Sequence, residues 1–404
     1  MMHALAWLAA LCVLAGVVQQ FLGTLLVERF VAEPEPPPLP EPPPVSVLKP
    51  LCGVEPLTEL ALESFFRIDY PAYQLVFGVQ DAADPVLQIV AELRRRYPAQ
   101  DVSVVVDETL HGGNRKVSNL INMLGQAKYP TLVMSDADIH VPPYFLTRVV
   151  SALRQPDVGL VTTFYTALPG MPHLATRLGA MQINYNFLPG ALLGSKLGRQ
   201  DCLGVTVALT RETLASVGGL QAVADRLADD QVLGRLVRAK GKRLAFANVF
   251  PATTVPESGF RELLFHELRW GRTIRALAPV AYSGSLLQIP LFWALLCLVF
   301  SGGSTAAWLL FGAVLLCRSG LARRLDKALR LCRTAGAGEE RAWVFVLRDL
   351  LTFGIIAVSY CGNGVSWRGQ RMRADTGRAS PPAPAAAMPR KVETHKVETF
   401  VESL

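Results

Sequence analysis

Short apolar runs alternate with longer amphipathic stretches between residues 45 and 138. Four runs are rich in β-branched residues and have the length of buried strands: residues 45–51, 74–81, 102–108 and 131–138. The stretches between them carry apolar residues at helical spacing: residues 57–67, 85–97 and 116–126. Regular alternation of strand and helix predicts an α/β domain with a mostly parallel sheet.

Three other segments are apolar enough to enter a bilayer. Residues 3–27 contain no Asp, Glu, Lys or Arg, and neither do residues 286–317, which include the break Gly302-Gly303-Ser304. No basic start or small-residue cleavage site flanks the first segment, so we expect an uncleaved anchor rather than a signal peptide. Residues 343–360 are apolar except for Arg348-Asp349, and we expect this segment to be re-entrant or interfacial rather than spanning.

Basic residues on both sides of the second segment predict the topology. Arg272 and Arg275 precede it, and a cluster at residues 318–333 follows it. A hairpin of two short spans that turns at the glycines keeps both basic groups on the inner face, as the positive-inside rule requires, whereas one long span does not. We therefore predict a multi-pass protein of the inner (cytoplasmic) membrane, with the sheet domain on the cytoplasmic face.

The predicted organisation also includes a stiff proline-rich linker and a Pro/Ala-rich tail that we expect to be disordered. In chain order the parts are an N-terminal transmembrane anchor (1–31), the linker (32–44), the sheet domain (45–250), a membrane-proximal helix (251–283), a transmembrane hairpin (284–317), a basic loop with the re-entrant or interfacial segment (318–378) and the tail (379–404).

Charge and cysteine content exclude two classes of function. Lys and Arg number 40 against 33 Asp and Glu, and the basic runs lack interleaved aromatic residues. This pattern argues against nucleic-acid binding and suits either an anionic membrane surface or a solvated face. The seven cysteines form no CxxC pair, so we expect no zinc site and buried thiols in a reducing compartment.

An acidic pair, Asp136-Ala137-Asp138, directly follows the last predicted strand. Two carboxylates this close repel each other unless a cation intervenes, and Mg²⁺ or Mn²⁺ supplies one while leaving sites for phosphate oxygens. Two further strands end in acid, at Asp81 and at Asp107-Glu108. Because ligands gather at the carboxyl ends of parallel strands, these acids favour a site over separate strand caps. Phosphatases of the haloacid-dehalogenase type share the pattern but have Thr or Val where this chain has His140, so that class is disfavoured.

Two downstream motifs also carry charge. Asp229-Asp230 begin a predicted helix, where acids either favour the helix dipole or serve chemistry. Arg269, Trp270 and further arginines lie on an amphipathic helix at residues 265–275, directly before the membrane hairpin. They either anchor an interfacial helix or bind a leaving diphosphate.

Taken in order, these motifs resemble the ceramide glucosyltransferase family, glycosyltransferase family 21. The segments that carry the resemblance are PPVSVLKPLCGVEP, FGVQDAADP, NRKVSNLINML, SDADIHVPP, ADDQVLGRLV and HELRW. The resemblance runs from about Pro43 to Arg275 and continues weakly to VSWRGQRMR at residues 365–373. It implies a GT-A-type nucleotide-sugar-binding domain, a UDP-sugar donor and a membrane lipid as acceptor.

The resemblance implies donor-side roles for five residues. Asp81 is expected on the uridine side of the UDP-sugar, and Asn114, Lys116 and Asn119 belong to the donor-side loop. Asp136 matches the second family aspartate. It is expected to bind donor and metal, with Asp138 as its metal partner.

On the acceptor side, Asp230 matches the third family aspartate and is the expected general base of an inverting transfer. Asp230→Asn is therefore expected to abolish transfer and to keep donor binding. Arg269 and Trp270 match the end of the (Q/R)xxRW motif. Its first position here is His266, an imidazole that donates to a phosphate or acceptor oxygen and is neutral or charged near pH 7.

Two segments, TLHGGNRKVSNLINML and HELRWGRTIRALAP, look closer to the bacterial hopanoid-biosynthesis glycosyltransferases than to animal ceramide enzymes. That branch implies transfer of one N-acetylglucosamine to the terminal hydroxyl of bacteriohopanetetrol. Transfer of glucose to ceramide is the alternative. A processive polysaccharide synthase, which usually has more spans, and a non-catalytic membrane scaffold also remain open.

Overall fold

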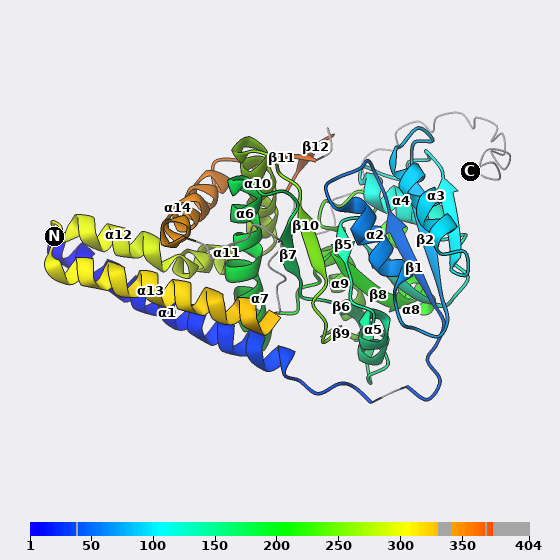
Figure 1. The fold of residues 1–404 in the computed structure, drawn as a ribbon, viewed down its shortest axis with the longest axis horizontal. Coiled ribbons are helices and arrows are strands. Elements are labelled where there is room, and N and C mark those ends of the chain that lie inside the picture. Colours follow the sequence, from blue (N-terminus) through cyan, green and yellow to red (C-terminus); the bar gives the residue numbers. More distant parts are fainter. Residues whose placement is uncertain (38, 330–340, 368–369, 375–404) are drawn as a thin grey trace.

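The computed structural model describes residues 1–37, 39–329, 341–367 and 370–374. An α/β domain and a group of long helices lie side by side, with a small sheet between them (Figure 1). The predicted tail at residues 379–404 lies outside the described residues.

The α/β domain is built on a sheet of seven strands in the order β3-β2-β1-β4-β8-β6-β9. Their bounds are β1 (Val45–Pro50), β2 (Tyr73–Val79), β3 (Asp101–Val106), β4 (Thr131–Ser135), β6 (Val158–Thr162), β8 (Thr206–Thr210) and β9 (Arg243–Phe246). Strands β3, β2, β1 and β4 are parallel to one another. Strand β8 runs antiparallel to both its neighbours, β4 and β6, and β9 is parallel to β6. The predicted α/β domain with a mostly parallel sheet is confirmed.

Helices cover both faces of this sheet, each against its own apolar core. One core takes side chains from α2 (Thr58–Phe66), α3 (Val86–Arg96) and α5 (Phe145–Leu153). The other takes them from α4 (Arg115–Met123), α8 (Arg211–Ser216), the 3₁₀ helix Leu220–Val223 and α9 (Asp229–Ala239). This three-layer arrangement buries nearly all of β1, β2 and β4, which explains their continuous apolar runs.

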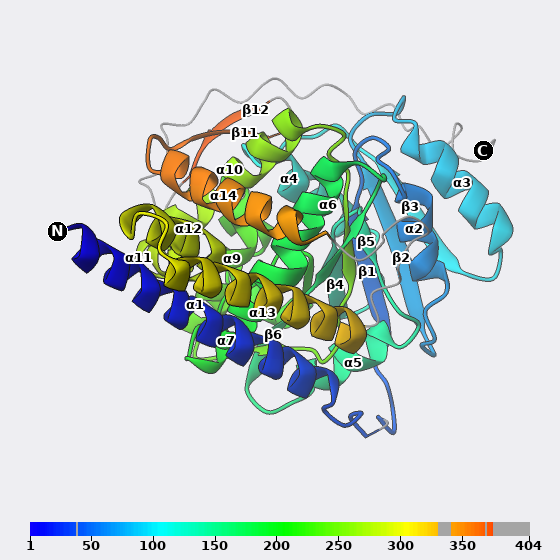
Figure 2. The same ribbon diagram turned by 60° about the vertical axis from the view of Figure 1, so that its left-hand side comes forward.

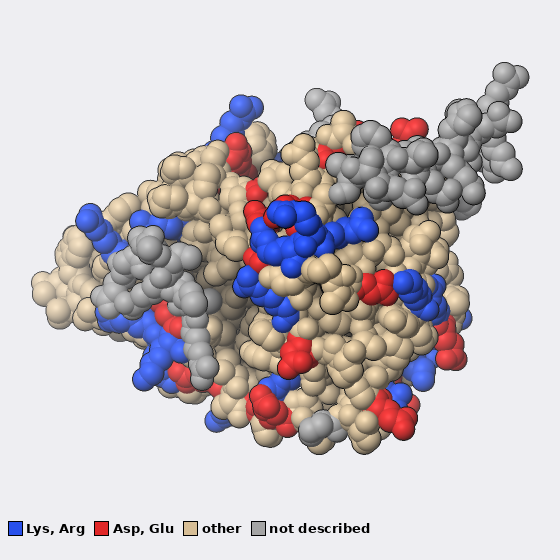
Figure 3. Space-filling model, turned by 45° about the vertical axis from the view of Figure 1, so that its right-hand side comes forward, with Lys and Arg blue, Asp and Glu red and all other residues tan. Residues whose placement is uncertain are grey.

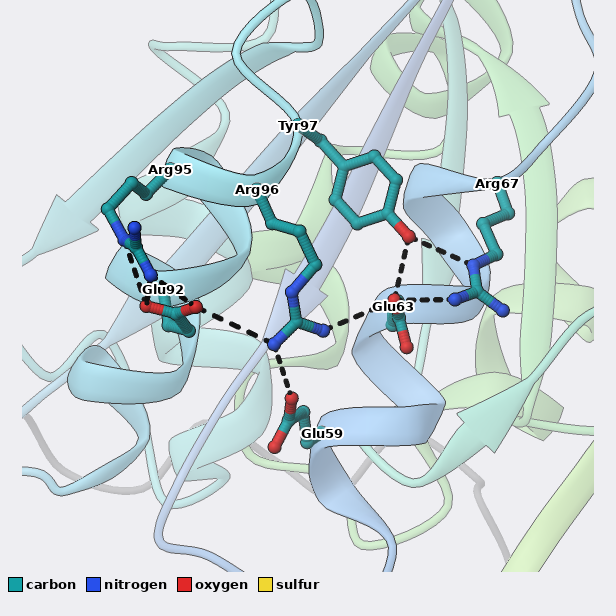
Figure 4. Close-up of polar contacts among 7 residues, drawn as sticks. All are labelled: Glu59, Glu63, Arg67, Glu92, Arg95, Arg96 and Tyr97. Atoms are coloured by element: carbon teal, nitrogen blue, oxygen red, sulfur yellow. Dashed lines mark hydrogen bonds and ion pairs between the residues drawn. The ribbon is translucent and has the colours of Figure 1, made fainter.

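A charged network joins α2 to α3 on the outer side of the domain (Figure 4). The Tyr97 hydroxyl donates to Glu63 at 2.7 Å and accepts from Arg67 at 2.9 Å, and Arg96 reaches both Glu63 and Glu59. The hydrogen bond from Tyr97 and the neighbouring arginines hold the pKa of the buried Glu63 carboxyl below its usual value, against the effect of burial. The network therefore stabilises the packing of these two helices while Glu63 is ionised.

A three-stranded sheet connects the α/β domain to the helical part. It consists of β5 (Ile139–His140), β10 (Ala252–Val255) and β7 (Thr166–Pro169) in that order. Strand β5 directly follows the acidic pair, and β10 leads into helix α10 (Phe260–Leu277). The pairing of β5 with β10 thus places the predicted metal site close to the start of the predicted HELRW helix.

The long helices pack together at one end of the molecule. Helix α1 (Met2–Val31) lies beside α12 (Pro290–Phe300) and α13 (Thr305–Leu329), with α14 (Ala342–Ser359) packed against α12 and α13 (Figures 1 and 2). The remaining elements here are α6 (Leu174–Met181), a π-helix (Gln182–Phe187), α7 (Leu188–Lys196), α11 (Pro279–Gly284), the 3₁₀ helix Ser285–Gln288 and the hairpin β11 (Gly364–Trp367) and β12 (Gln370–Arg373).

Three described helices, α1, α13 and α14, are long and apolar enough to cross a membrane, and α11 to α12 form a bent pair that adds a fourth candidate. On α1, the large apolar side chains Trp7, Leu11 and Leu14 are exposed, as a lipid-facing surface requires. In Figure 3 the tip of this helical end carries few charged side chains. These features mark a membrane protein.

We predicted a basic loop that begins at residue 318. For residues 318–329 this is wrong, because they belong to α13, which ends at Leu329. Its arginines find partners on other helices: Arg318 is buried and bonded to Asp349, and Arg324 pairs with Glu28 of α1 at 2.6 Å. With their charges neutralised, these residues continue the helix instead of ending it.

Residues 342–359 form one uninterrupted helix, which has no reversal of the kind that a re-entrant segment needs. Arg348 and Asp349, the charges that argued against a span, are both 0% exposed and bonded inside the helical bundle. The interfacial placement of this segment stays a prediction.

Candidate active site

A small cavity lies at the carboxyl end of β4, between α4 and α9. Its polar lining consists of Ser135, Asp136, Lys116, Asp229 and Asp230. In Figure 3 basic and acidic side chains gather near the middle of the face shown. The parallel strands β1 and β4 end at the same edge, as expected for a ligand site in such a sheet.

Lys116 and Asp136 form an ion pair in this cavity, with 2.5 Å between Nζ and Oδ1. Burial lowers the pKa of the Lys116 ammonium, but the carboxylates of Asp136, Asp229 and Asp230 outweigh it and hold the pKa above its usual value. Lys116 therefore stays charged and is the cation that neutralises the acidic cluster in this structure.

Lys49 hydrogen-bonds the backbone of the turn that carries the acidic pair. This lysine is fully buried at the end of β1, where its Nζ donates to the Asp136 carbonyl at 2.6 Å and lies 3.7 Å from the centre of the Phe65 ring. Burial lowers its pKa to about 7, although Asp138 and Asp136 act in the opposite direction. A buried lysine with these partners fixes the backbone of the turn.

Strand β10 holds Asp138 from the other side. The Thr253 hydroxyl donates a short hydrogen bond to the Asp138 carboxylate, and the Thr254 amide donates to the Asp138 carbonyl at 3.1 Å. The Thr254 hydroxyl also bonds His140 at 2.8 Å. Burial and then the neighbouring charge of Asp136 raise the pKa of Asp138 to about 6, against the effect of the Thr253 bond.

The carboxylates of Asp136 and Asp138 are oxygen ligands of the kind that divalent cations take. Among the described residues, no group of three or more His, Cys, Asp or Glu side chains converges on one point. Two carboxylates nevertheless suffice for Mg²⁺ or Mn²⁺ when phosphate and water oxygens complete the shell. Burial and then the charge of Asp136 raise the pKa of Asp138, and a cation between the two carboxylates would relieve the part due to their repulsion.

Asp229 and Asp230 begin α9 and face the same cavity. Asp230 accepts from the Gln231 amide at 2.8 Å, and Asp229 accepts from the Asn114 side chain at 3.2 Å. Burial and then the charge of Asp229 raise the pKa of Asp230 to about 7, with Lys116 opposing them. An added Cβ at Gly204 would lie 2.8 Å from Asp230 Oδ2, so only glycine leaves this carboxylate its present place. The cavity thus brings a carboxyl group with a pKa near neutrality next to Asp136.

The three other predicted donor-side residues lie away from the open part of the cavity. Asn114 is buried and caps α4 by accepting from the Val117 amide at 3.2 Å. Asn119 is buried and donates to the Gly78 carbonyl at 2.8 Å, so it braces strand β2. Asp81 is exposed after β2 and accepts from the Ala83 amide at 2.9 Å. Asn114 and Asn119 thus bond groups within the protein, among them the cavity residue Asp229 for Asn114, and Asp81 lies at the surface.

The HELRW residues lie on α10, next to the small sheet. His266 bonds the buried Glu257 carboxylate through Nδ1, and its ring meets Trp270 edge-on at 4.7 Å between centroids. Trp270 packs against an apolar cluster that includes Tyr165. Burial and then the charges of Asp230 and Asp138 raise the pKa of the Tyr165 phenol, and Arg269 lowers it. Tyr165 therefore lies within electrostatic reach of both the carboxylates and the HELRW helix.

The sequence interpretation missed four residues at this site: Lys49, Tyr165, Thr253 and Glu257. Lys49 carried a usable signal, since a lysine inside an otherwise apolar buried strand requires a specific partner. The other three have none, because Tyr, Thr and Glu are ordinary in strands and loops. Their roles arise from strand pairing and helix packing.

Fold and site together define a GT-A-type α/β domain joined to membrane helices. The sequence model described as "Glycosyl transferase family 21" matches residues 8–380. The chain belongs to that family.

Similar proteins include ceramide glucosyltransferases of two eukaryotes. Ceramide glucosyltransferase 1 of Caenorhabditis elegans is 24% identical over 207 residues, which cover 50% of this chain and 43% of that protein. The ceramide glucosyltransferase of Komagataella phaffii is 31% identical over 112 residues, which cover 27% of this chain and 22% of that protein. The chain thus spans less than half the length of these curated relatives.

Among solved structures, a mannosyltransferase from Pyrobaculum calidifontis in complex with GDP-Man and Mn²⁺ matches 89% of this chain and 99% of its own, with a TM-score of 0.48 and 18% identity. Glucosyl-3-phosphoglycerate synthase from Mycobacterium tuberculosis matches 62% of this chain and 80% of its own, with a TM-score of 0.37 and 16% identity.

Proposed function

We propose that this protein transfers a single sugar from a UDP-sugar to a hydroxyl group of a membrane lipid. One observation carries the proposal: Asp136, Asp138, Lys116 and the near-neutral Asp230 share one sheet edge, adjacent to a helix that leads into candidate membrane spans. Family membership and the ceramide glucosyltransferase relatives support the same class of reaction.

The donor would bind with its diphosphate toward Lys116 and the acidic pair. A Mg²⁺ or Mn²⁺ ion held by Asp136 and Asp138 would neutralise charge on the diphosphate. Lys116, now paired with Asp136, is positioned to exchange that carboxylate for a phosphate oxygen. Asp81 would contact the uridine part from the loop after β2, and Asn114 and Asn119 would shape the donor side of the site.

Asp230 would act as the general base. With a pKa raised to about 7, it is substantially deprotonated at neutral pH and basic enough to take the proton of an attacking hydroxyl. Attack on the anomeric carbon from the side opposite the UDP would invert its configuration. His266 and Arg269 would donate to the leaving diphosphate or the acceptor, and Trp270 would pack beneath the acceptor.

The acceptor and the location are the finer parts of the proposal. The named relatives support glucose transfer to ceramide, whereas the motif resemblance described above predicts N-acetylglucosamine transfer to bacteriohopanetetrol. Both acceptors present a primary hydroxyl near the membrane surface. The candidate spans and the positive-inside rule support a multi-pass protein of the inner (cytoplasmic) membrane with a cytoplasmic catalytic domain.

Membranes containing the protein test this proposal when supplied with UDP-glucose or UDP-N-acetylglucosamine, each with ceramide or bacteriohopanetetrol. Mass spectrometry of the lipid products is expected to show one added hexose or N-acetylhexosamine, which EDTA suppresses and added Mn²⁺ restores. A long glycan product would instead indicate a processive synthase. UDP binding without transfer to either lipid would contradict the proposal.

A further inference from the structure

Two buried ion pairs lie next to each other along helix α14, and they connect it to different parts of the molecule. Arg348 binds Glu267 of α10, whereas Asp349 binds Arg318 of α13. Ion pairs in apolar surroundings carry a large desolvation penalty, so charges at such positions require complete sets of partners. The candidate site described above uses neither pair.

The Arg348–Glu267 pair has the geometry of a two-point clamp. Nη1 lies 2.6 Å from Oε1 and Nη2 lies 2.8 Å from Oε2. Arg348 also donates to the Leu178 carbonyl of α6 and to the Thr352 hydroxyl, both at 3.1 Å. A planar guanidinium bonded in this way fixes the direction of the carboxylate as well as its distance.

Glu267 is the polar member of the stripe that faces the bundle. The buried residues of α10 are Leu263, Glu267 and Gly271, spaced four apart. A Cβ at Gly271 would lie 3.4 Å from the Ile355 side chain of α14, so the two helices are in close contact there. The clamp therefore sits in the middle of the α10–α14 interface.

Successive residues of a helix point about 100° apart, so the direction of one residue fixes those of its neighbours. His266 precedes Glu267, and Arg269 and Trp270 follow it on the same helix. Locking the rotation of α10 at Glu267 thus sets where these three side chains lie relative to the carboxylates at the sheet edge.

We propose that Glu267 and Arg348 are positioning residues, through which membrane helix α14 sets the rotation of α10 and presents His266, Arg269 and Trp270 to the site. The adjacent Arg318–Asp349 pair connects α14 to α13 and α12. Within the described residues neither side chain hydrogen-bonds α10, which makes the pair a natural control. The kinetic part of this inference rests on the proposed function, whereas the structural part is independent of it.

The first test measures a distance. Spin labels are attached at Phe265→Cys on α10 and Arg94→Cys on α3, which are both exposed positions. The native cysteines that react with the label are first replaced. The double variant Glu267→Met/Arg348→Met keeps similar volume and leaves no unpaired buried charge, which favours folding. Double electron–electron resonance measures the distance between the two labels. We expect one narrow distance distribution in the parent and a broadened or shifted one in this variant.

The matched control, Arg318→Met/Asp349→Leu, removes the neighbouring pair and is expected to keep the narrow distribution. The reversed pair, Glu267→Arg/Arg348→Glu, is expected to restore it. An unchanged distribution in Glu267→Met/Arg348→Met would overturn the inference. Equal broadening in that variant and the control would also overturn it, because the pair would then serve general packing alone.

The second test measures transfer from UDP-glucose or UDP-N-acetylglucosamine to ceramide or bacteriohopanetetrol. Because misplacing catalytic groups by about 1 Å lowers rates roughly 100-fold, the clamp variant is expected to lose about 10- to 100-fold in kcat. Its KM for the UDP-sugar is expected to change less than its kcat, because Lys116 and Asp136 hold their places independently of α10. A normal kcat beside an altered distance distribution would contradict coupling to the site. A parent protein inactive on both lipids would refute the proposed function, and the distance measurement would still decide the positioning role.

Discussion

Replacing Asp230 by Asn separates the chemical role of this carboxylate from its effect on stability. Burial and the adjacent Asp229 raise the pKa of Asp230 from 3.8 to about 7. At a pH between these two pKa values, the Asp230 carboxyl keeps its proton in the folded protein and loses it in the unfolded chain. The carboxylate therefore lowers the free energy of unfolding progressively as the pH rises from about 4 to about 7, and an uncharged amide removes this effect.

The stabilisation expected for Asp230→Asn can be estimated from the rise in the pKa of Asp230. A rise of about three pKa units corresponds to roughly 4 kcal/mol, which is an upper limit. Asp230 keeps some contact with solvent, and Lys116 loses one of its counter-charges in the variant. We therefore expect a net stabilisation of about 1–2 kcal/mol at pH 8, which is a few degrees in the denaturation midpoint.

Thermal denaturation of the detergent-solubilised protein at pH 5 and pH 8 measures this effect, and the lipid transfer assay measures the chemistry. Asp230→Asn is expected to lose about 10²- to 10⁴-fold in transfer rate, to keep UDP binding and to melt above the parent, with the gap widening toward pH 8. Asp229→Asn is the matched control, because the pKa of Asp229 is also raised by burial. It is expected to share the stabilisation but to keep measurable transfer. Normal transfer by Asp230→Asn, or a gap independent of pH, would refute the reasoning.

Three further predictions concern the supports of the site and the fold. Thr253→Val removes the hydroxyl bonded to the acidic pair, so the Mn²⁺ concentration for half-maximal transfer is expected to rise about tenfold in EDTA-treated membranes, and an unchanged titration would contradict this. Tyr97→Phe is expected to lower the free energy of unfolding by about 1–2 kcal/mol at pH 7. That loss should shrink below pH 4.5 as Glu63, with its lowered folded-state pKa, becomes protonated, whereas a constant loss would exclude its charge as the cause. Gly16→Ala places a Cβ against the Leu287 carbonyl and is expected to lower the denaturation midpoint, while Gly312→Ala, with open space around it, is not.

The α/β domain was predictable because each of its signals is local. Buried parallel strands require continuous apolar runs, and the helices between them require one apolar face, so both leave periodic patterns in the chain. The acidic pair was predictable as a site for a similar reason. The end of a buried strand and the edge of a parallel sheet are positions that the order of elements already defines. Asp136 and Asp138 therefore needed no knowledge of distant contacts to be proposed as site residues. Asp230 was proposed only through the family resemblance, because acids at the start of a helix also serve as caps.

The supporting residues depend on contacts between segments far apart in the chain. Thr253 reaches Asp138 only because β10 pairs with β5, a register that no local pattern encodes. Asn119 illustrates the converse, since its motif predicts donor binding while its side chain bonds the Gly78 carbonyl inside the domain. A polar residue in a recognised motif can thus contribute to the site by holding a strand rather than by touching the ligand.

The helix at residues 342–359 shows that a charge pair in an apolar segment can have two explanations. Arg348-Asp349 argued against a span at residues 343–360, since an isolated charge in hydrocarbon is costly. That cost depends on partners, and here the partners come from α10, α12 and α13, more than 20 residues away in the chain. The charges are therefore evidence of helix packing rather than of exposure. Through Glu267, Arg348 also connects α14 to the helix that carries His266, Arg269 and Trp270. A forked ion pair adds to the apolar contacts a directional constraint on the rotation of the helix. The residues that weakened the prediction of a span are for that reason the ones best suited to align it with the site.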